Sequence, residues 1–195
     1  MSPLDSLSAI IRHRRTIKPA SMDPDRPLDR SLLLTLLENA TWAPTHGLTE
    51  PWRFRIFEGA ARQDIASALQ RIYREVTPAH EFREDKLVKM SENALLAPTV
   101  VVTWMQRTIG HKVPAIEERE AVACALQNIM LSAAAIDLGA FWSSPPLIDS
   151  TEFRTWLGIG DEDVCLALLY LGWPKPGFAW PASVRKPISD LITWA

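Results

Sequence analysis

The run Arg14-Arg15-Thr16, flanked by Arg12 and Lys18, has the residue types of an anion site. Guanidinium groups bind phosphate through paired hydrogen bonds, and a neighbouring hydroxyl adds a donor. The same run also follows a predicted helix, and cations at a helix C-terminus complement the helix dipole without any ligand. Taken alone, it fits either a phosphate site or a charged helix end.

Two further groups have residues suited to a flat ligand. Trp42 and His46 lie in a Pro- and Trp-rich stretch that cannot be regular structure, where a histidine is either solvated or part of a pocket. Trp142 is followed by the hydroxyl pair Ser143 and Ser144, which would place donors at the end of a predicted strand. For Trp142 the competing interpretation is core packing.

The C-terminal stretch contributes two more cations, Arg185 and Lys186, which are either ligands for an anion or a solvated pair. No metal set is predicted, because the four histidines have no ligand spacing relative to one another or to the cysteines: His13, His46, His80 and His111. Adjacent carboxylates such as Glu117-Glu118 are predicted to lie on solvated faces. The sequence shows no set of residues typical of hydrolytic catalysis.

Alternating helix and strand patterns must position these groups. Helices are predicted from Ser2-Pro3 to about residue 15, from Asp29 to Pro44, and over 60–75, 81–96, 115–138 and 151–157. Strands are predicted over 53–57, 99–104, 140–142 and 164–172, and residues 173–195 are predicted to form an extended arm. The elements lack a regular βαβ rhythm, which favours an α+β fold in a single domain, 1–195.

Composition narrows the function classes. The net charge of −2 gives no basic field for nucleic acid, and the sequence has neither GxGxxG nor GxxxxGK[ST]. The longest strongly apolar stretch, Val164 to Leu171, is too short to span a bilayer, and no signal-peptide pattern opens the chain. Cys124 and Cys165 lie in apolar stretches and are predicted to be buried. We therefore expect a cytoplasmic protein.

In order along the chain, these groups resemble the motifs of the FMN-dependent nitroreductase family, in particular its compact NAD(P)H nitroreductase branch. The resemblance covers nearly the whole chain. It is carried by Arg14-Arg15-Thr16, Ala43-Pro44-Thr45-His46, Pro51-Trp52-Arg53-Phe54, Ala97-Pro98-Thr99-Val100, Gln127-Asn128, Leu138-Gly139-Ala140-Phe141-Trp142, Gly172-Trp173-Pro174, Arg185-Lys186-Pro187 and the loop His111-Lys112-Val113-Pro114.

The resemblance implies an α+β, nitroreductase-like fold: a central, mostly antiparallel sheet flanked by helices, in an interlocked homodimer with FMN at the subunit interface. Arg14 and Thr16, with Arg15 taking part or supporting them, would hold the flavin phosphate and ribityl chain. Arg185 or Lys186 would add charge at the phosphate. The remaining predicted contacts lie along the flavin ring, the first two from the partner subunit: Trp42, His46, Trp142, Ser143 and Ser144.

The implied activity is ping-pong hydride transfer from NAD(P)H to nitroaromatic, quinone or similar electron-poor acceptors. No protein acid or base is required, because the flavin carries the chemistry. Trp42 and Ser143 stand where the compact branch often has arginines, so two cations near the flavin are missing, for which Arg53 and Arg55 are the candidate substitutes. Three alternatives stay open: dehalogenation, flavin breakdown, and flavin binding without catalysis.

Overall fold

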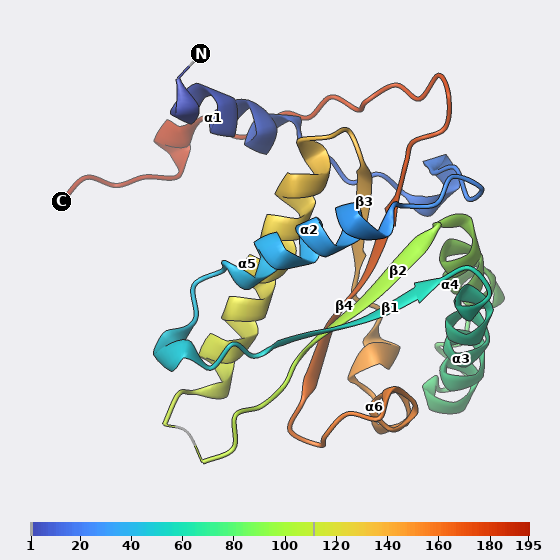
Figure 1. The fold of residues 1–195 in the computed structure, drawn as a ribbon. Coiled ribbons are helices and arrows are strands. Elements are labelled where there is room, and N and C mark those ends of the chain that lie inside the picture. Colours follow the sequence, from blue (N-terminus) through green and yellow to red (C-terminus); the bar gives the residue numbers. More distant parts are fainter. Residues whose placement is uncertain (1, 111) are drawn as a thin grey trace.

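A computed structural model describes residues 2–110 and 112–195, so His111 lies outside the described residues. Four strands form one sheet in the order β1-β2-β4-β3, and each neighbouring pair is antiparallel (Figure 1). The strands are β1 (Trp52–Glu58), β2 (Thr99–Met105), β3 (Gly139–Ser143) and β4 (Val164–Gly172). The predicted α+β class and the antiparallel sheet are confirmed.

Helices cover both faces of the sheet (Figure 1). They are α1 (Pro3–His13), α2 (Arg30–Thr41), α3 (Ala61–Val76), α4 (Glu84–Leu96), α5 (Ala115–Ala134) and α6 (Thr151–Leu157), with 3₁₀ turns η1 (Pro19–Ser21), η2 (His46–Leu48), η3 (Pro146–Asp149) and η4 (Ile188–Asp190). One core lies between the sheet and α3, α4 and α6, and the other between the sheet and α2 and α5.

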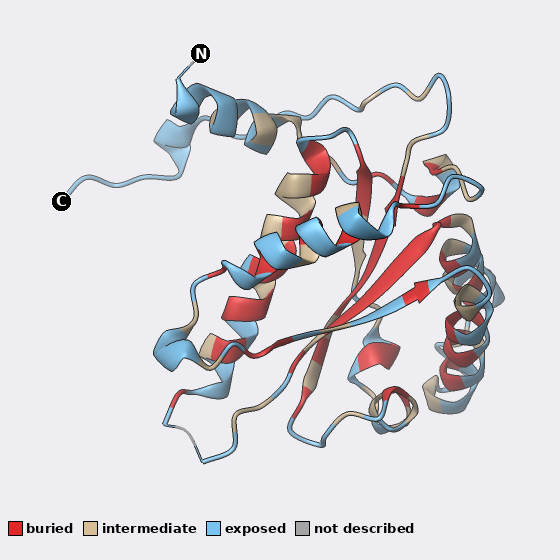
Figure 2. Ribbon diagram, viewed as in Figure 1, coloured by how far each residue is buried: buried red, intermediate tan, exposed pale blue. Residues whose placement is uncertain are grey.

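Alternation along the central strands supplies both cores. On β2, Val100 and Val102 belong to the core beneath α3 and α4, while Val101 belongs to the core beneath α5. Because successive strand side chains point to opposite faces, a strand that is apolar at every position needs cover on both sides. β2 and β4 accordingly lie in the middle of the sheet and are buried along most of their length (Figure 2).

Local signals set most helix ends. Ser2 and Asp5 form a capping box at the predicted start of α1, and Asp29 caps α2 by accepting hydrogen bonds from the first-turn amides. The helix predicted over 115–138 ends earlier, at Ala134. Its chain leaves the helix through Asp137, whose φ is +56°, and the Leu138 amide returns to the Ala133 carbonyl at 2.9 Å.

Two expectations about burial are wrong. Cys124 is exposed on α5, because it faces away from the sheet. Cys165 on β4 is buried as predicted, and burial raises the pKa of its thiol to about 12. Glu118, predicted to be solvated with Glu117, is buried instead. It faces the chain that follows β2, where Arg107 supplies a compensating charge.

Beyond β4, residues 173–195 form an extended C-terminal segment, the arm. It leaves the sheet, crosses above it and returns to α1, and both α1 and the arm lie almost entirely in solvent (Figures 1 and 2). Among the described residues, no helix has both the length and the apolar character needed to cross a membrane.

Candidate functional site

The segment after α1 lies along the free edge of β3. Thr16 forms a parallel bridge with Ala140, and the Ile17 amide donates to the Ala140 carbonyl at 3.0 Å. A Cβ atom at Gly139 would lie 3.0 Å from the Ile17 side chain and 2.8 Å from the Gly172 carbonyl oxygen. Glycine at 139 is therefore what allows the segment to approach the sheet so closely.

Arg14 stands at the point where α1 ends and this segment begins. Its backbone leaves the helical region after its amide bonds the Ile10 carbonyl. The side chain is half-buried, and no described residue accepts a hydrogen bond from its guanidinium. Arg14 and the exposed hydroxyl of Thr16 thus present free donors beside β3, as an anion site requires.

Arg15 joins this segment to the arm. Its Nε donates to the Pro181 carbonyl at 2.9 Å, and its Nη1 donates to the carbonyls of Arg12 and Arg14. Trp180 adds a second tie, since its indole donates to the His13 carbonyl at 2.8 Å and stacks on the His13 ring at 4.6 Å. Arg15 therefore supports the site by holding the arm against the end of α1.

The arm brings Arg185 back to the C-terminal end of α1. A cavity of about 380 Å³ is lined by Arg12 and Arg15 from the N-terminal region and by Arg185 from the arm. The Arg185 guanidinium bonds Ser183 and the Val184 carbonyl, and Lys186 is exposed beside it. Cations that are about 170 positions apart in sequence thus meet on one surface.

A larger pocket of about 620 Å³ opens on the other side of β3, toward α3 and α4. Phe141 and Ser143 line it from the strand, and Pro145 and Pro146 line it from the turn that follows. Thr77 and Pro78, from the α3–α4 connection, line it as well. Its walls are mainly apolar with a few polar groups, which is typical of a pocket for a flat organic ligand.

Three polar side chains of α4 in this pocket were missed from the sequence. Lys86, Lys89 and Asn93 line it, and their spacing of three and four residues puts them on one face of the helix. That spacing is visible in the sequence, but the helix carries charges on several sides and only its packing selects this face. The lysines supply cations close to Ser143, where arginine is absent.

Trp142, Ser143 and Ser144 do not share one wall. Strand alternation turns Ser143 into the large pocket, whereas Trp142 packs against the core beneath α5. The Trp142 indole donates to Ser144 Oγ at 2.8 Å, and both side chains donate to the Leu166 carbonyl. Of the three, only Ser143 lines the pocket in the described structure.

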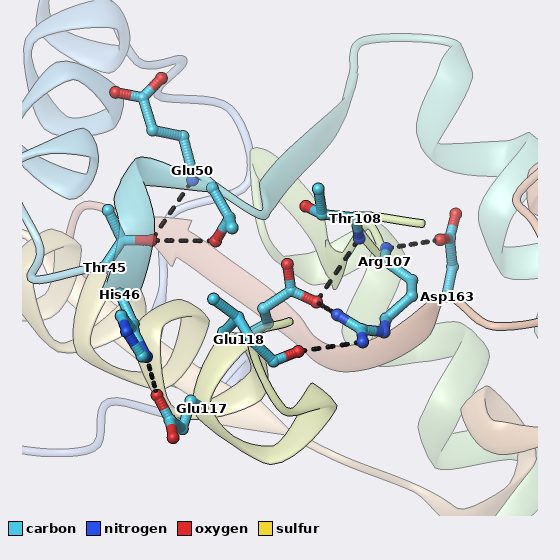
Figure 3. Close-up of polar contacts among 10 residues, drawn as sticks. Thr45, His46, Glu50, Arg107, Thr108, Glu117, Glu118 and Asp163 are labelled. Carbon is cyan, nitrogen blue, oxygen red and sulfur yellow. Dashed lines mark hydrogen bonds and ion pairs between the residues drawn. The ribbon is translucent and has the colours of Figure 1, made fainter. Parts of the chain in front are cut away.

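His46 lies at the opposite end of α5 from the cations, whereas Trp42 ends α2 three residues after Asn39, which bonds Asn128 and Ser132 of α5. α1 contacts the C-terminal end of α5, where His13 bonds Asp137, while η2 contacts its N-terminal end, where His46 bonds Glu117 (Figures 1 and 3). A helix of 20 residues is about 30 Å long. One protomer therefore cannot bring His46 to a ligand held by Arg14.

Arg53 and Arg55 are likewise remote from the large pocket within a protomer. They lie on β1, at the opposite edge of the sheet from β3. The Arg53 guanidinium is already bonded to the carbonyls of Glu50 and Trp52 at 2.8 Å each. The nearby positive charge comes instead from the α4 lysines.

Comparison with known proteins places this geometry in a family. The model of the Nitroreductase family matches residues 11–173. The chain is 27% identical over 185 residues to the Escherichia coli protein named "Putative NAD(P)H nitroreductase YdjA", covering 94% of this chain and 96% of that one. It is 28% identical over 182 residues to a 5,6-dimethylbenzimidazole synthase of Rhodospirillum rubrum, covering 88% and 83%.

Solved structures have the same fold. A nitroreductase-like family protein of Bacillus cereus superposes with a TM-score of 0.83 at 25% identity, covering 100% of this chain and 98% of that one. A Desulfovibrio desulfuricans structure, described as "a putative nitroreductase in complex with fmn", superposes with a TM-score of 0.74 at 20% identity, covering 100% of this chain and 98% of that one.

Proposed function

Because the chain belongs to the nitroreductase family, we propose that it is an FMN-dependent oxidoreductase that uses NAD(P)H to reduce nitroaromatics, quinones or similar electron-poor acceptors. The observation that carries the proposal is the arrangement of three separate segments: the Arg14–Thr16 segment lies along the edge of β3, Arg185 of the arm lines a cavity with Arg12 and Arg15, and α4 faces β3 across the larger pocket. The name of the Escherichia coli relative and the FMN complex from Desulfovibrio desulfuricans support it.

The residues present fit FMN by the chemistry of their donors. Arg14 and Thr16 offer unbonded donors to a dianionic phosphate, and Arg185 or Lys186 adds charge from the arm. The phosphate end is thus the cationic surface, with Arg15 in its supporting role.

The apolar pocket fits the flavin ring. Ser143 and Asn93 provide hydrogen-bonding groups for ring carbonyls and nitrogens, and Phe141 provides an apolar surface. Lys86 and Lys89 line this pocket together with the carboxylates of Glu81 and Asp149, and the lysines are the candidate substitutes there for the cations missing at Trp42 and Ser143. When bound, FMN supplies the hydride-transfer chemistry, and the chain positions and tunes it.

The proposed active form is the homodimer, with Trp42 and His46 reaching the flavin of the other subunit. Trp42 is 82% exposed, and a protomer leaves apolar side chains of α1 and the arm in solvent, among them Leu4, Leu7, Val184 and Ile188. Such side chains on two touching elements indicate a partner surface. An interlocked dimer would cover them and complete the site from both chains.

One absorbance spectrum tests the cofactor and the activity together. Purified protein, reconstituted with FMN, is expected to show bound-flavin bands that bleach when NADH or NADPH is added without oxygen, and that return with a nitroaromatic or a quinone. Colourless protein that binds no FMN on titration would reject the proposal. Bound FMN that neither nucleotide reduces would indicate flavin binding without catalysis.

Flavin breakdown is the second candidate, favoured by the similarity to the Rhodospirillum rubrum 5,6-dimethylbenzimidazole synthase. The two candidates differ in what happens to the cofactor. Under aerobic turnover with a reductant, a reductase returns FMN intact, whereas a flavin-degrading enzyme consumes it. Chromatographic recovery of FMN after turnover distinguishes them. For either activity we expect a cytoplasmic setting, in keeping with the free Cys124 and Cys165.

A further inference from the structure

The His46 ring is bonded by a carboxylate from another element. Its Nδ1 lies 2.5 Å from Glu117 Oε2, and the two side chains come from η2 and the first turn of α5 (Figure 3). A carboxylate only accepts hydrogen bonds, so the proton of this bond lies on Nδ1. The other ring nitrogen, Nε2, has no hydrogen bond to any described residue.

The loop that carries His46 has an unusual backbone. Leu48 and Glu50 both adopt positive φ values, +52° and +45°, next to Gly47 at +61°. Residues other than glycine are strained in this region, and such strain persists only where the surroundings impose it. The Thr45 hydroxyl holds the loop by accepting from the Glu50 amide at 3.3 Å and bonding Thr49 Oγ1 at 3.2 Å (Figure 3).

The other partner, Glu117, is anchored through its neighbour. Glu118 is fully buried and pairs with the guanidinium of Arg107, and the backbone amide of Arg107 donates to Asp163 at 2.9 Å (Figure 3). Arg107 also donates to the Val113 carbonyl at 3.0 Å, just before α5 begins. The first turn of α5 is thus fixed to the interior on one side, while Glu117 projects from it toward η2.

We propose that Glu117 is a positioning residue for His46: its carboxylate holds the proton on Nδ1 and sets the ring plane, so that Nε2 is presented outward to the flavin of the partner subunit. The inference rests on the proposed function for the identity of that ligand. A strained loop on one side and a buried anchor on the other hold the two members of the pair at a defined separation. This is how a supporting carboxylate orients a histidine at a functional site.

The pairing is tested without any cofactor by ¹⁵N NMR of the histidine rings, at about pH 9, where ordinary imidazoles are neutral. In the wild type we expect His46 to carry its proton on Nδ1. Glu117→Ala should move it mainly to Nε2, the preferred tautomer of a free imidazole. Glu117→Gln, whose amide oxygen can still accept, should restore the wild-type pattern. Glu120→Gln is the matched control, an exposed acid one turn further along α5. Identical His46 signals in the wild type and Glu117→Ala would overturn the proposal.

The link to the flavin is tested by FMN titration in a double-mutant cycle. Glu117→Ala should weaken FMN binding about five- to tenfold in the wild type, which is the effect of one lost hydrogen bond, and should have no effect in a His46→Ala background. An equal loss in both backgrounds would show a merely structural role and overturn the proposal. If the wild type binds no FMN, the proposed function fails, and the flavin-facing role fails with it, whereas the NMR result stands on its own as a measure of the pairing.

Discussion

At the N-terminal end of α5 the Arg107–Glu118 ion pair is buried, whereas just beyond its C-terminal end the His13–Asp137 contact lies in solvent. The Arg107 and Glu118 side chains are 17% and 0% exposed, but those of His13 and Asp137 are 41% and 77% exposed. Glu118 of α5 pairs with Arg107, just before the helix, whereas Asp137, just after the helix, pairs with His13 of α1, far away in sequence. They differ in what surrounds them, since Arg107 of the first pair also donates to the Val113 carbonyl, whereas the second pair stands where α1 meets solvent.

The difference indicates two ways of holding a functional segment. The buried pair fixes the start of α5, and so the Glu117–His46 contact, with little freedom, because removing either charge would strand the other in the interior. At the exposed end, α1 and the arm contact each other through backbone carbonyls and ring stacking, and His13 bonds Asp137. That end offers its apolar and cationic groups to something outside the protomer.

The largest effect should come from breaking the buried pair. Glu118→Ala leaves Arg107 unpaired near the interior and should lower the free energy of unfolding by about 3–5 kcal/mol, measured by urea denaturation. Glu120→Ala, on the exposed side of the same helix, should change it by less than about 0.5 kcal/mol. Equal losses in the two variants would mean that the two ends of α5 do not differ in this way.

The exposed end should matter for ligand binding instead. Arg14→Ala should weaken FMN binding about 30-fold, or about 2 kcal/mol, because charge-assisted bonds to phosphate are lost, with stability nearly unchanged. Arg119→Ala, an exposed cation near the other end of α5, is the control and should leave FMN affinity as it is. Fluorescence quenching of FMN measures both. An unchanged FMN affinity in Arg14→Ala would contradict the proposal that Arg14 binds the flavin phosphate.

Of the two ends of α5, the buried one should be where acidification lowers the stability of the fold, through protonation of Glu118. Burial raises the pKa of Glu118, but hydrogen bonds from Thr108 and Arg107 outweigh burial and leave the pKa below its ordinary value. The folded state therefore binds this proton more weakly than the unfolded chain, so Glu118 stabilises the fold above about pH 4.3 and loses that effect as the pH falls through the lowered pKa. Stability measured against pH should fall less steeply on acidification in Glu118→Gln than in the wild type. Parallel profiles would contradict this.

The smallest effect is expected at the exposed pair. Asp137→Asn removes the charge opposite His13, where water screens the interaction, and should cost less than about 1 kcal/mol in thermal or urea unfolding. Its left-handed backbone is tolerated equally well by asparagine, so the change isolates the charge. A loss as large as that of Glu118→Ala would show that the His13 contact is a main anchor of α1.

Several elements could be predicted because their signals are local. The helix at Thr151–Leu157 and the strand at Val164–Gly172 have the predicted bounds, since capping residues and apolar runs lie within the elements themselves. The end of α5 could not be placed, because an aspartate rather than Gly139 takes the left-handed position. The burial of Glu118 but not of Glu117 could not be predicted, because it depends on which side of the helix faces Arg107.

Of the candidate site, the sequence by itself determined the residue types: the cations at 14–15, the hydroxyl at 16 and the second cationic pair at 185–186, together with the α+β class that separates them. Only the tertiary structure decided which of these groups meet. It joined Arg15 and Arg185 on one surface, brought Lys89 and Asn93 to Ser143, and left His46 at the far end of α5. The reason is physical: side-chain chemistry is a property of each residue, whereas proximity depends on contacts between segments that no local pattern encodes.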